Sequence, residues 1–383
     1  MNENTPLRIV LLAKQDTSPY FTYQALAGIF RSQGYSATIA DSAETIPAAD
    51  IVITHNTYGF AEGTLNEVAR KGIRVVSFMD NPMDKFAFLE TIDPSVILVF
   101  TDPAHIPLAR EIVGNKNRII DHPLDIAMFA PEQVKPLAER TYDLLFVGRL
   151  VTFGSVNEYS FLERRLARQI VEATLHSTEK LIHEIAIEAF QPYKKMFLYR
   201  KEFISEYFLK YCWKLSHAVR REKRMRVLNE LKKADKELNI AFVSNDSAAL
   251  KKEFGAHHSF FDFMPWSSVV NMMGDSKVVV NTMPSRMECL HERLVETMFS
   301  GAVCLTDVNR KIKADFADRK NIVTFNYRSS NLSDALKSII RKDTELQSIA
   351  DAGRQRIAEL VNENNWIALV QKIVAGEPDL KVF

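Results

Sequence analysis

The sequence predicts an α/β protein of two domains, each built on a parallel β-sheet with helices on both faces. Three observations predict this class. The chain has 383 residues, which is too long for one ordinary hydrophobic core. Short apolar runs alternate with amphipathic stretches in both halves, as expected for buried parallel strands joined by helices. A segment with three prolines, residues 122–141, separates the two series of strands.

In the first half, five apolar runs are expected to form strands: residues 8–13, 36–41, 50–55, 75–80 and 96–101. The amphipathic segment 19–34 predicts a helix that ends at Gly34, because glycine readily adopts the left-handed conformation of a helix C-terminus. This half is therefore Rossmann-like. Its first strand-to-helix turn, residues 13–20, contains no glycine, which disfavours a bound dinucleotide and a dehydrogenase.

In the second half, strands are expected at residues 142–150, 239–246, 277–283, 302–307 and 321–327. Residues 155–238 carry no strand signal and have helical periodicity, so a helical insertion of two or more helices is expected there. We expect a first domain over 1–130, a linker over 131–141 and a second domain over 142–360. A C-terminal helix over 361–383 is expected to pack back toward the first domain.

The composition excludes several classes of protein. A formal net charge of +1 gives no general reason to bind nucleic acid. The three cysteines have no metal-binding spacing, and a reducing compartment suits them best. The chain has no leader-like start and no run of about 18 apolar residues, so a cytoplasmic location is expected.

The segment 281–307 is the most informative for function. It combines a strand end, a loop, a helix, a glycine and another strand, and within it seven residues separate Glu288 from Glu296. Such a spacing also occurs on solvated helix faces. Its place directly after a buried strand favours ligand binding instead.

This pattern resembles the donor-binding signature of GT-B glycosyltransferases, whose two Rossmann-like domains face each other across a cleft. The resemblance implies that Glu296 accepts hydrogen bonds from the donor ribose and that Glu288 faces the donor sugar. Arg293, Glu296 and Gly301 are also similar to the signature of a narrower branch, the spore-maturation-protein-like glycosyltransferases. The first domain would then bind the acceptor and the second the donor.

Two further fragments resemble the same family. Gly148 and Arg149 in FVGRL resemble the turn where glycine admits the donor diphosphate and arginine pairs with it. The family usually has a lysine shortly afterwards, where this chain has VTFGS; Arg149, Arg164, Arg165 or Arg293 would have to replace it. Residues 261–281, with Met264 and Asn281, resemble the loop, helix and strand around the nucleotide base.

A general base is expected from the first domain if the reaction inverts the sugar configuration. Asp80 is the first candidate and His55 the second, both at predicted strand ends; Asp102 is a third. Asp80 could equally cap the turn that follows it. No metal site is expected, because no DxD pair stands in a suitable context, and no cofactor is expected beyond the nucleoside-diphosphate sugar substrate.

Residues 194–226 carry eleven lysines and arginines, only three acids and interleaved aromatic residues. Such a stretch suits an anionic membrane surface, a polyanionic acceptor or single-stranded nucleic acid. Alternatively, the aromatic residues form the buried core of a helical pair and the cations form its solvent-exposed face. We favour this interpretation for most of the aromatic residues. Peripheral membrane contact is the secondary hypothesis, and nucleic acid is not expected as a partner.

These observations predict a metal-independent glycosyltransferase of hexosyltransferase type. It would transfer a sugar from a nucleoside-diphosphate sugar to a glycan, lipid or protein, in cell-surface glycan biosynthesis. Two alternatives stay open: a non-catalytic scaffold or surface-assembly protein of the same fold, and a nucleotide-sugar epimerase.

Overall fold

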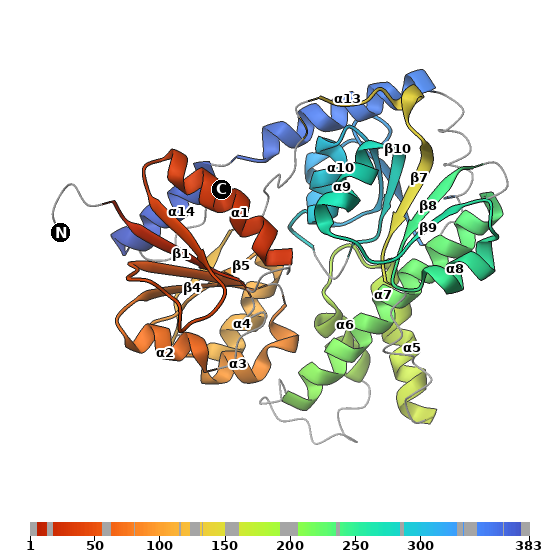
Figure 1. Ribbon diagram of the computed structural model, residues 1–383. Coiled ribbons are helices and arrows are strands. Elements are labelled where there is room, and N and C mark those ends of the chain that lie inside the picture. Colours follow the sequence, from red (N-terminus) through yellow and green to blue (C-terminus); the bar gives the residue numbers. More distant parts are fainter. Residues whose placement is uncertain are drawn as a thin grey trace. The chain divides into compact units, whose positions relative to one another are not determined.

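The chain forms two compact units in the computed structural model shown in Figure 1. Unit 1 comprises Met1–Met128, Ile204–Leu209 and Asn362–Phe383, and unit 2 comprises Phe129–Phe203 and Lys210–Val361. The structure describes residues 6–13, 18–55, 63–79, 81–114, 116–122, 131, 133–149, 161–191, 206–234, 238–283, 287–327, 332, 343–362 and 364–376. No helix in these ranges is both long and apolar enough to cross a membrane.

Unit 1 is built on a six-stranded parallel sheet in the order β2-β1-β3-β4-β5-β6. Its strands are β1 (Arg8–Leu12), β2 (Ser36–Ala40), β3 (Ile51–His55), β4 (Arg74–Met79), β5 (Ile97–Phe100) and β6 (Ile119–Asp121). The central strands are almost continuously apolar and fully buried, as they must be when helices cover both faces of a parallel sheet.

Helices cover the two faces of this sheet (Figure 1). One face packs against α1 (Ser18–Ser32) and α14 (Asn364–Ala375), and the other against α2 (Thr64–Arg70), α3 (Phe86–Thr91) and α4 (Ile106–Val113). The alternation of a strand decides which face each side chain meets: Ile9 and Leu11 lie under α1 and α14, while Val10 and Leu12 lie under the other helices. Short 3-10 turns, Pro82–Asp84 and Pro103–His105, follow β4 and β5.

Unit 2 contains a second six-stranded parallel sheet, in the order β12-β11-β10-β7-β8-β9. Its strands are β7 (Tyr142–Val147), β8 (Ile240–Val243), β9 (Ser259–Phe261), β10 (Ser276–Asn281), β11 (Val303–Asp307) and β12 (Val323–Phe325). Its helices are α5 (Phe161–His176), α6 (Ile182–Phe190), α7 (Glu206–Ala234), α8 (Ser247–Phe254), α9 (Trp266–Gly274), α10 (Glu292–Phe299), α11 (Arg310–Asp315) and α13 (Asp343–Leu360), with a 3-10 turn at Leu137–Glu139. The first four residues of α7, 206–209, belong to unit 1.

The helical insertion of unit 2 lies in the connection from β7 to β8. Its helices α5 and α6 pack together, and Phe190 of α6 contacts Tyr211 of α7 with ring centroids 5.8 Å apart. The last part of α7 packs on the sheet itself, where Val227, Leu228 and Leu231 are buried beside α8 and α13. Helix α7 therefore belongs both to the insertion and to the layer that covers the sheet.

The predicted fold class is confirmed: two parallel sheets flanked by helices, with a helical insertion in the second. All ten predicted strands are present. The sequence patterns missed β6 and β9, which are the last strands at one edge of each sheet and span three residues each. β12 is equally short, but it stands within the longer run 321–327 that predicts a strand, whereas β6 and β9 stand within no such run.

Candidate functional site

The carboxyl ends of the parallel strands in unit 2 bring polar residues from distant parts of the chain to one edge of the sheet. Gly148 and Arg149 follow β7, Asn245 follows β8, Asn281 ends β10, Asp307 ends β11 and Tyr327 follows β12. Open α/β sheets bind ligands at this edge. We call these residues, together with Arg293 of α10 and the basic residues of α7 that reach them, the cationic edge.

Gly148 leaves room for an arginine from the insertion. Its backbone N–H donates to the Val243 carbonyl at 3.0 Å. A Cβ atom at Gly148 would lie 3.4 Å from Nε of Arg224, at the short limit of ordinary van der Waals contact, and the Arg224 guanidinium donates to the Arg149 carbonyl. With the Asn245 amide oxygen turned toward Arg149, that side chain accepts from the Arg149 guanidinium at 2.9 Å. The glycine thus lets α7 lie against the turn after β7.

Lys223 fastens α7 to the ends of two strands. Its Nζ lies 2.7 Å from Oδ2 of Asp307 and donates to the Met283 carbonyl at 3.0 Å. The Met283 N–H donates to the other Asp307 oxygen at 2.6 Å. The side chains of Lys223 and Asp307 are only 14% and 5% exposed, so this ion pair is largely shielded from water. Because Lys223 binds both Asp307 and the Met283 carbonyl, it holds α7 against this edge of the sheet.

Tyr327 completes the surroundings of this ion pair. Lys223 Nζ lies 5.6 Å from the centre of its ring, within the range of a cation–π contact. Burial, and next the Asp307 carboxylate, raise the pKa of Tyr327 well above its usual value, so the phenol stays protonated.

Arg293 and Arg224 are like-charged neighbours in a partly buried place. Arg293, in the first turn of α10, donates to Oδ1 of Asn281 at 3.3 Å, and its Nε is buried without a hydrogen-bond partner among the described residues. Burial lowers the pKa of Arg293. Burial, and then the charges of Arg293, Arg220 and Arg149, lower the pKa of Arg224 to about 10. Arginine remains charged even so, and this part of the cationic edge favours an anion.

The start of α10 is capped from within the chain. The ring Nδ1 of His291 accepts from the Arg293 N–H at 3.1 Å, so His291 has a structural role at the helix N-terminus. Glu296 lies one turn further along α10 and is fully buried, with 0% exposure. Met264 follows β9 and packs, partly buried, against the core under α9.

Gly301 lies at the opposite edge of the sheet, just before β11, and is not brought together with the other predicted donor residues. Its φ of +68° is left-handed. A Cβ atom there would lie 2.2 Å from Cγ1 of Val134. The buried Arg140 side chain donates nearby to the Ser300 carbonyl at 3.0 Å and to the Ser276 carbonyl at 2.8 Å. The geometry therefore gives Gly301 a packing role against residues of the expected linker.

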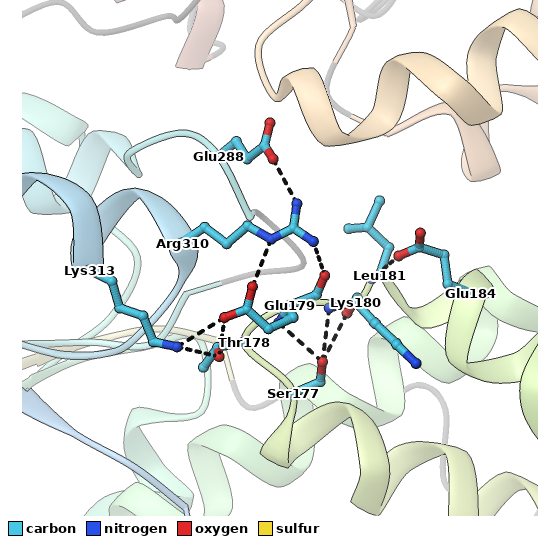
Figure 2. A network of polar contacts seen from close by, with 9 residues as sticks. All are labelled: Ser177, Thr178, Glu179, Lys180, Leu181, Glu184, Glu288, Arg310 and Lys313. Carbon is cyan, nitrogen blue, oxygen red and sulfur yellow. Dashed lines mark hydrogen bonds and ion pairs between the residues drawn. The ribbon is translucent and has the colours of Figure 1, made fainter.

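Glu288 belongs to a surface network, shown in Figure 2, that joins the turn between α5 and α6 to α11. Its carboxylate pairs with Arg310 at 2.7 Å. Arg310 also pairs with the Glu179 carboxylate at 3.1 Å and donates to the Glu179 carbonyl. Lys313 pairs with Glu179 at 3.0 Å and donates to the Thr178 hydroxyl at 2.8 Å.

The contacts of this network shift the pKa values of Arg310 and Glu179 in the directions that favour their charged forms. Hydrogen bonding to Glu288 raises the pKa of Arg310, and hydrogen bonding from Lys313 lowers the pKa of Glu179. The side chain of Glu288 is 37% exposed, so one part of it faces solvent while Arg310 holds its orientation. A ligand hydroxyl could therefore reach Glu288 from the solvent side.

The candidate bases lie in unit 1. His55 is the last residue of β3 and is partly buried. Asp80 falls outside the described residues. Its neighbour Asn81 accepts from the Met83 N–H at 3.0 Å, and Asp102 accepts from the Ala104 N–H at 3.1 Å; both thus cap the 3-10 turns that follow their strands. Across the described ranges, no group of three or more His, Cys, Asp or Glu is arranged to hold a metal ion.

The basic segment 194–226 is divided between different environments. Residues 194–205 lie outside the described ranges. Within α7, Phe208 is buried and Tyr211 contacts α6, whereas Tyr207 is 74% exposed and Trp213 37% exposed. Sequence reasoning missed Lys223 and Arg224 as members of the cationic edge, and it placed Arg164 and Arg165 as alternatives instead; these lie on α5, partly exposed and exposed. The high density of lysine and arginine in RREKRMR, residues 220–226, is the sequence feature that could have indicated these two residues.

Comparisons with known proteins agree with this fold. A family model described as "Glycosyl transferase-like" matches residues 220–374. No curated protein sequence is significantly similar to the chain. The fold is similar to that of sucrose-phosphate synthase from Thermosynechococcus elongatus, with 10% identity and a TM-score of 0.55 over 97% of this chain and 100% of that one.

Two further solved structures are similar over nearly the whole chain. A glycosyltransferase from Rickettsia africae ESF-5 is 10% identical with a TM-score of 0.53, covering 97% of this chain and 100% of that one. A glycosyltransferase involved in avilamycin A biosynthesis is 11% identical with a TM-score of 0.51, covering 97% and 99%. The chain shares the fold of these solved structures, and the match to the glycosyltransferase-like family model is confined to residues 220–374.

Proposed function

We propose that the protein is a glycosyltransferase that moves a sugar from a nucleoside-diphosphate sugar to a glycan, lipid or protein acceptor. One observation carries the proposal: Arg224 and Arg293 stand together, partly buried, at the cationic edge, and Nε of Arg293 is buried without a partner in the described part of the chain. Neighbouring guanidinium groups in a place of low dielectric are stabilised by an anion with more than one negative charge. A diphosphate has that charge and matches the donor fork of arginine.

The residues of the cationic edge then have distinct roles toward the donor. Arg149, Arg224 and Arg293 pair with the diphosphate, and Gly148 lets it approach the backbone. Met264 and Asn281 lie on the side of the base. By the resemblance to the family, Glu296 accepts from the ribose and Glu288 faces the sugar. Gly301 has no contact with the donor in this proposal, because it packs against Val134 at the opposite edge of the sheet.

The reaction needs stabilisation of the negative charge that develops on the leaving diphosphate. In this proposal the three arginines supply it without a bound metal. For an inverting reaction, Asp80 or His55 of unit 1 would accept the proton of the acceptor hydroxyl. We further propose a hexosyltransferase of the spore-maturation-protein-like branch that acts in cell-surface glycan synthesis in the cytoplasm.

Calorimetric titration with UDP, GDP and ADP tests the donor site. Wild type is expected to bind one of them, and Arg224→Ala or Arg293→Ala to weaken that binding about 10- to 100-fold, the worth of one charge-assisted hydrogen bond. Arg221→Ala is the matched control, because Arg221 is an exposed arginine of the same helix. No binding to any nucleotide, or an equal loss in Arg221→Ala, would overturn the proposal.

Product analysis with the sugar conjugate of the bound nucleotide separates the remaining alternatives. A transferase passes the sugar to an added acceptor. An altered sugar formed without an acceptor would indicate an epimerase, and nucleotide binding with no turnover toward any acceptor would indicate a scaffold.

A further inference from the structure

One face of α7 carries an aromatic and basic stripe that leads away from the cationic edge. Trp213, His217, Arg220 and Arg224 follow one another at intervals of four, three and four residues, which places them on the same side of a helix. Arg224 lies at Gly148, and Trp213 is eleven residues earlier, or about 16 Å along the helix axis. We call Trp213, His217 and Arg220 the α7 stripe.

The α7 stripe is not the packing face of the helix. The buried residues of the same helix segment, Cys212, Leu215 and Val219, point elsewhere and are at most 2% exposed. Trp213 is 37% exposed, and His217 and Arg220 are partly exposed. The rings of Trp213 and His217 meet edge to face, with centroids 4.6 Å apart and planes at 82°. This contact orients the indole, while much of its surface stays open to solvent.

The surroundings of the α7 stripe are strongly basic. Between Lys210 and Arg224 the sequence has six lysines and arginines and one acid, Glu222. Lys223 is paired with Asp307, and Arg224 belongs to the cationic edge, but Lys214 and Arg221 are exposed beside the stripe. Burial, and then the charges of Arg220 and Arg224, lower the pKa of His217, so that the ring is neutral and able to accept or donate a hydrogen bond.

We propose that the α7 stripe binds an acidic saccharide, as the acceptor of the transfer. The inference rests on the proposed function, because the stripe continues from the site assigned to the donor diphosphate. An exposed, oriented indole offers a flat surface to a sugar ring, and arginine and lysine pair with a carboxylate or a phosphate. The shared chemistry is a sugar with negative charge, whether a uronic acid or a phosphorylated sugar supplies it.

A membrane surface suits the same residues less well. A helix that lies on a membrane exposes a broad apolar face. In α7 the apolar face is buried within the protein, and Tyr207 and Trp213 are its only exposed large apolar side chains in the described part of the chain. Charge without an apolar face favours a polar anionic ligand.

Titration of the full chain with hexagalacturonate, a phosphorylated maltohexaose and neutral maltohexaose tests this inference. We expect at least one acidic oligosaccharide to bind, and the neutral one not to bind. Trp213→Ala is expected to weaken binding of the acidic oligosaccharide about tenfold, the equivalent of one aromatic contact, while Trp213→Phe retains most of it. Tyr207→Ala, another exposed aromatic of α7, is the matched control and should have no effect.

Nucleotide binding, measured on the same samples, separates this inference from the proposed function. Trp213→Ala should bind the nucleotide as tightly as wild type. Wild type that binds a nucleotide but no acidic oligosaccharide, or binds one equally well in Trp213→Ala, overturns the acceptor inference alone. Equal binding of neutral maltohexaose, or Trp213-dependent binding to phosphatidylglycerol vesicles without oligosaccharide binding, overturns it too. Absence of nucleotide binding overturns the proposed function.

Discussion

Both units contain a parallel sheet of six strands, but the carboxyl edges of the two sheets differ in charge. In unit 1, His122 follows β6 with 0% exposure, where burial, and next the charge of Lys372, lower its pKa to about 3. Its ring packs edge-on against Trp366 of α14 at 4.7 Å. In unit 2, Arg224 occupies the corresponding edge with a pKa lowered to about 10, still charged at neutral pH.

Burial has different consequences for the histidine and for the arginine. A buried histidine becomes neutral and joins the hydrophobic core, so at the end of β6 packing takes the place of charge. A buried arginine cannot lose its proton at neutral pH, so the edge of unit 2 keeps a charge that an anionic ligand can neutralise. Four sets of substitutions test the effects of burial and charge in the two units.

The largest effect is expected at the buried ion pair of unit 2. Lys223→Met leaves the Asp307 carboxylate buried without its cation, and should lower the free energy of unfolding by about 3–5 kcal/mol in urea denaturation. Asp307→Asn in the same chain should recover part of the loss. Lys232→Met is the control, because Lys232 of the same helix forms an exposed ion pair with Glu253 of α8. If both lysine variants lose the same stability, the buried pair does not hold α7.

The next largest effect is expected at the opposite edge of the same sheet. Gly301→Ala places a methyl group against Val134 in a left-handed conformation, and should lower the free energy of unfolding by about 2–4 kcal/mol. Nucleotide affinity should not change, because the cationic edge is elsewhere. Gly28→Ala, in α1 with open space around it, should instead stabilise by about 0.5–1 kcal/mol. A loss of nucleotide binding at unchanged stability would make Gly301 a ligand contact instead.

The burial of His122 in unit 1 should make the free energy of unfolding depend on pH. The pKa of His122 falls from 6.5 in the unfolded chain to about 3 in the folded one, so only the unfolded chain gains a proton in that range. The stabilisation is fully present above pH 6.5 and is lost as the pH falls toward 3, by about 2 kcal/mol between pH 7 and pH 5. Urea unfolding at both pH values should show that loss reduced in His122→Phe. An identical pH dependence in the variant would contradict it.

The smallest effect is expected in the surface network of Figure 2. Arg310 and Glu179 are 42% and 60% exposed, so Arg310→Ala should change the free energy of unfolding by less than about 1 kcal/mol. Added salt should reduce even this effect. Lys313→Ala serves as a second exposed cation of α11. If Arg310→Ala lowered the free energy of unfolding as much as Lys223→Met, the exposed network and the buried ion pair would not differ in their contribution to stability.

Most of the fold could be predicted because its signals are local. Apolar runs such as 142–147 and 276–281 mark buried strands wherever they occur. The cationic edge was only half predictable. Gly148, Arg149, Asn281 and Arg293 stand in motifs, whereas Lys223 and Asp307 are 84 residues apart and neither sequence neighbourhood indicates the other. Helical periodicity predicts that α7 is a helix, but not which turn of it reaches the end of β11.

The length of the insertion has a consequence for how unit 2 acquires its structure. β8 begins at residue 240 and β7 ends at residue 147, so 92 residues separate two neighbouring strands. Closing that loop costs about 1.6 kcal/mol more chain entropy than a connection of about fifteen residues, a small thermodynamic effect. During synthesis, however, β7 emerges about 5–20 s before β8. Helices form from local contacts. The helices of the insertion are therefore the first elements made after β7 that can cover this apolar strand before β8 is synthesised.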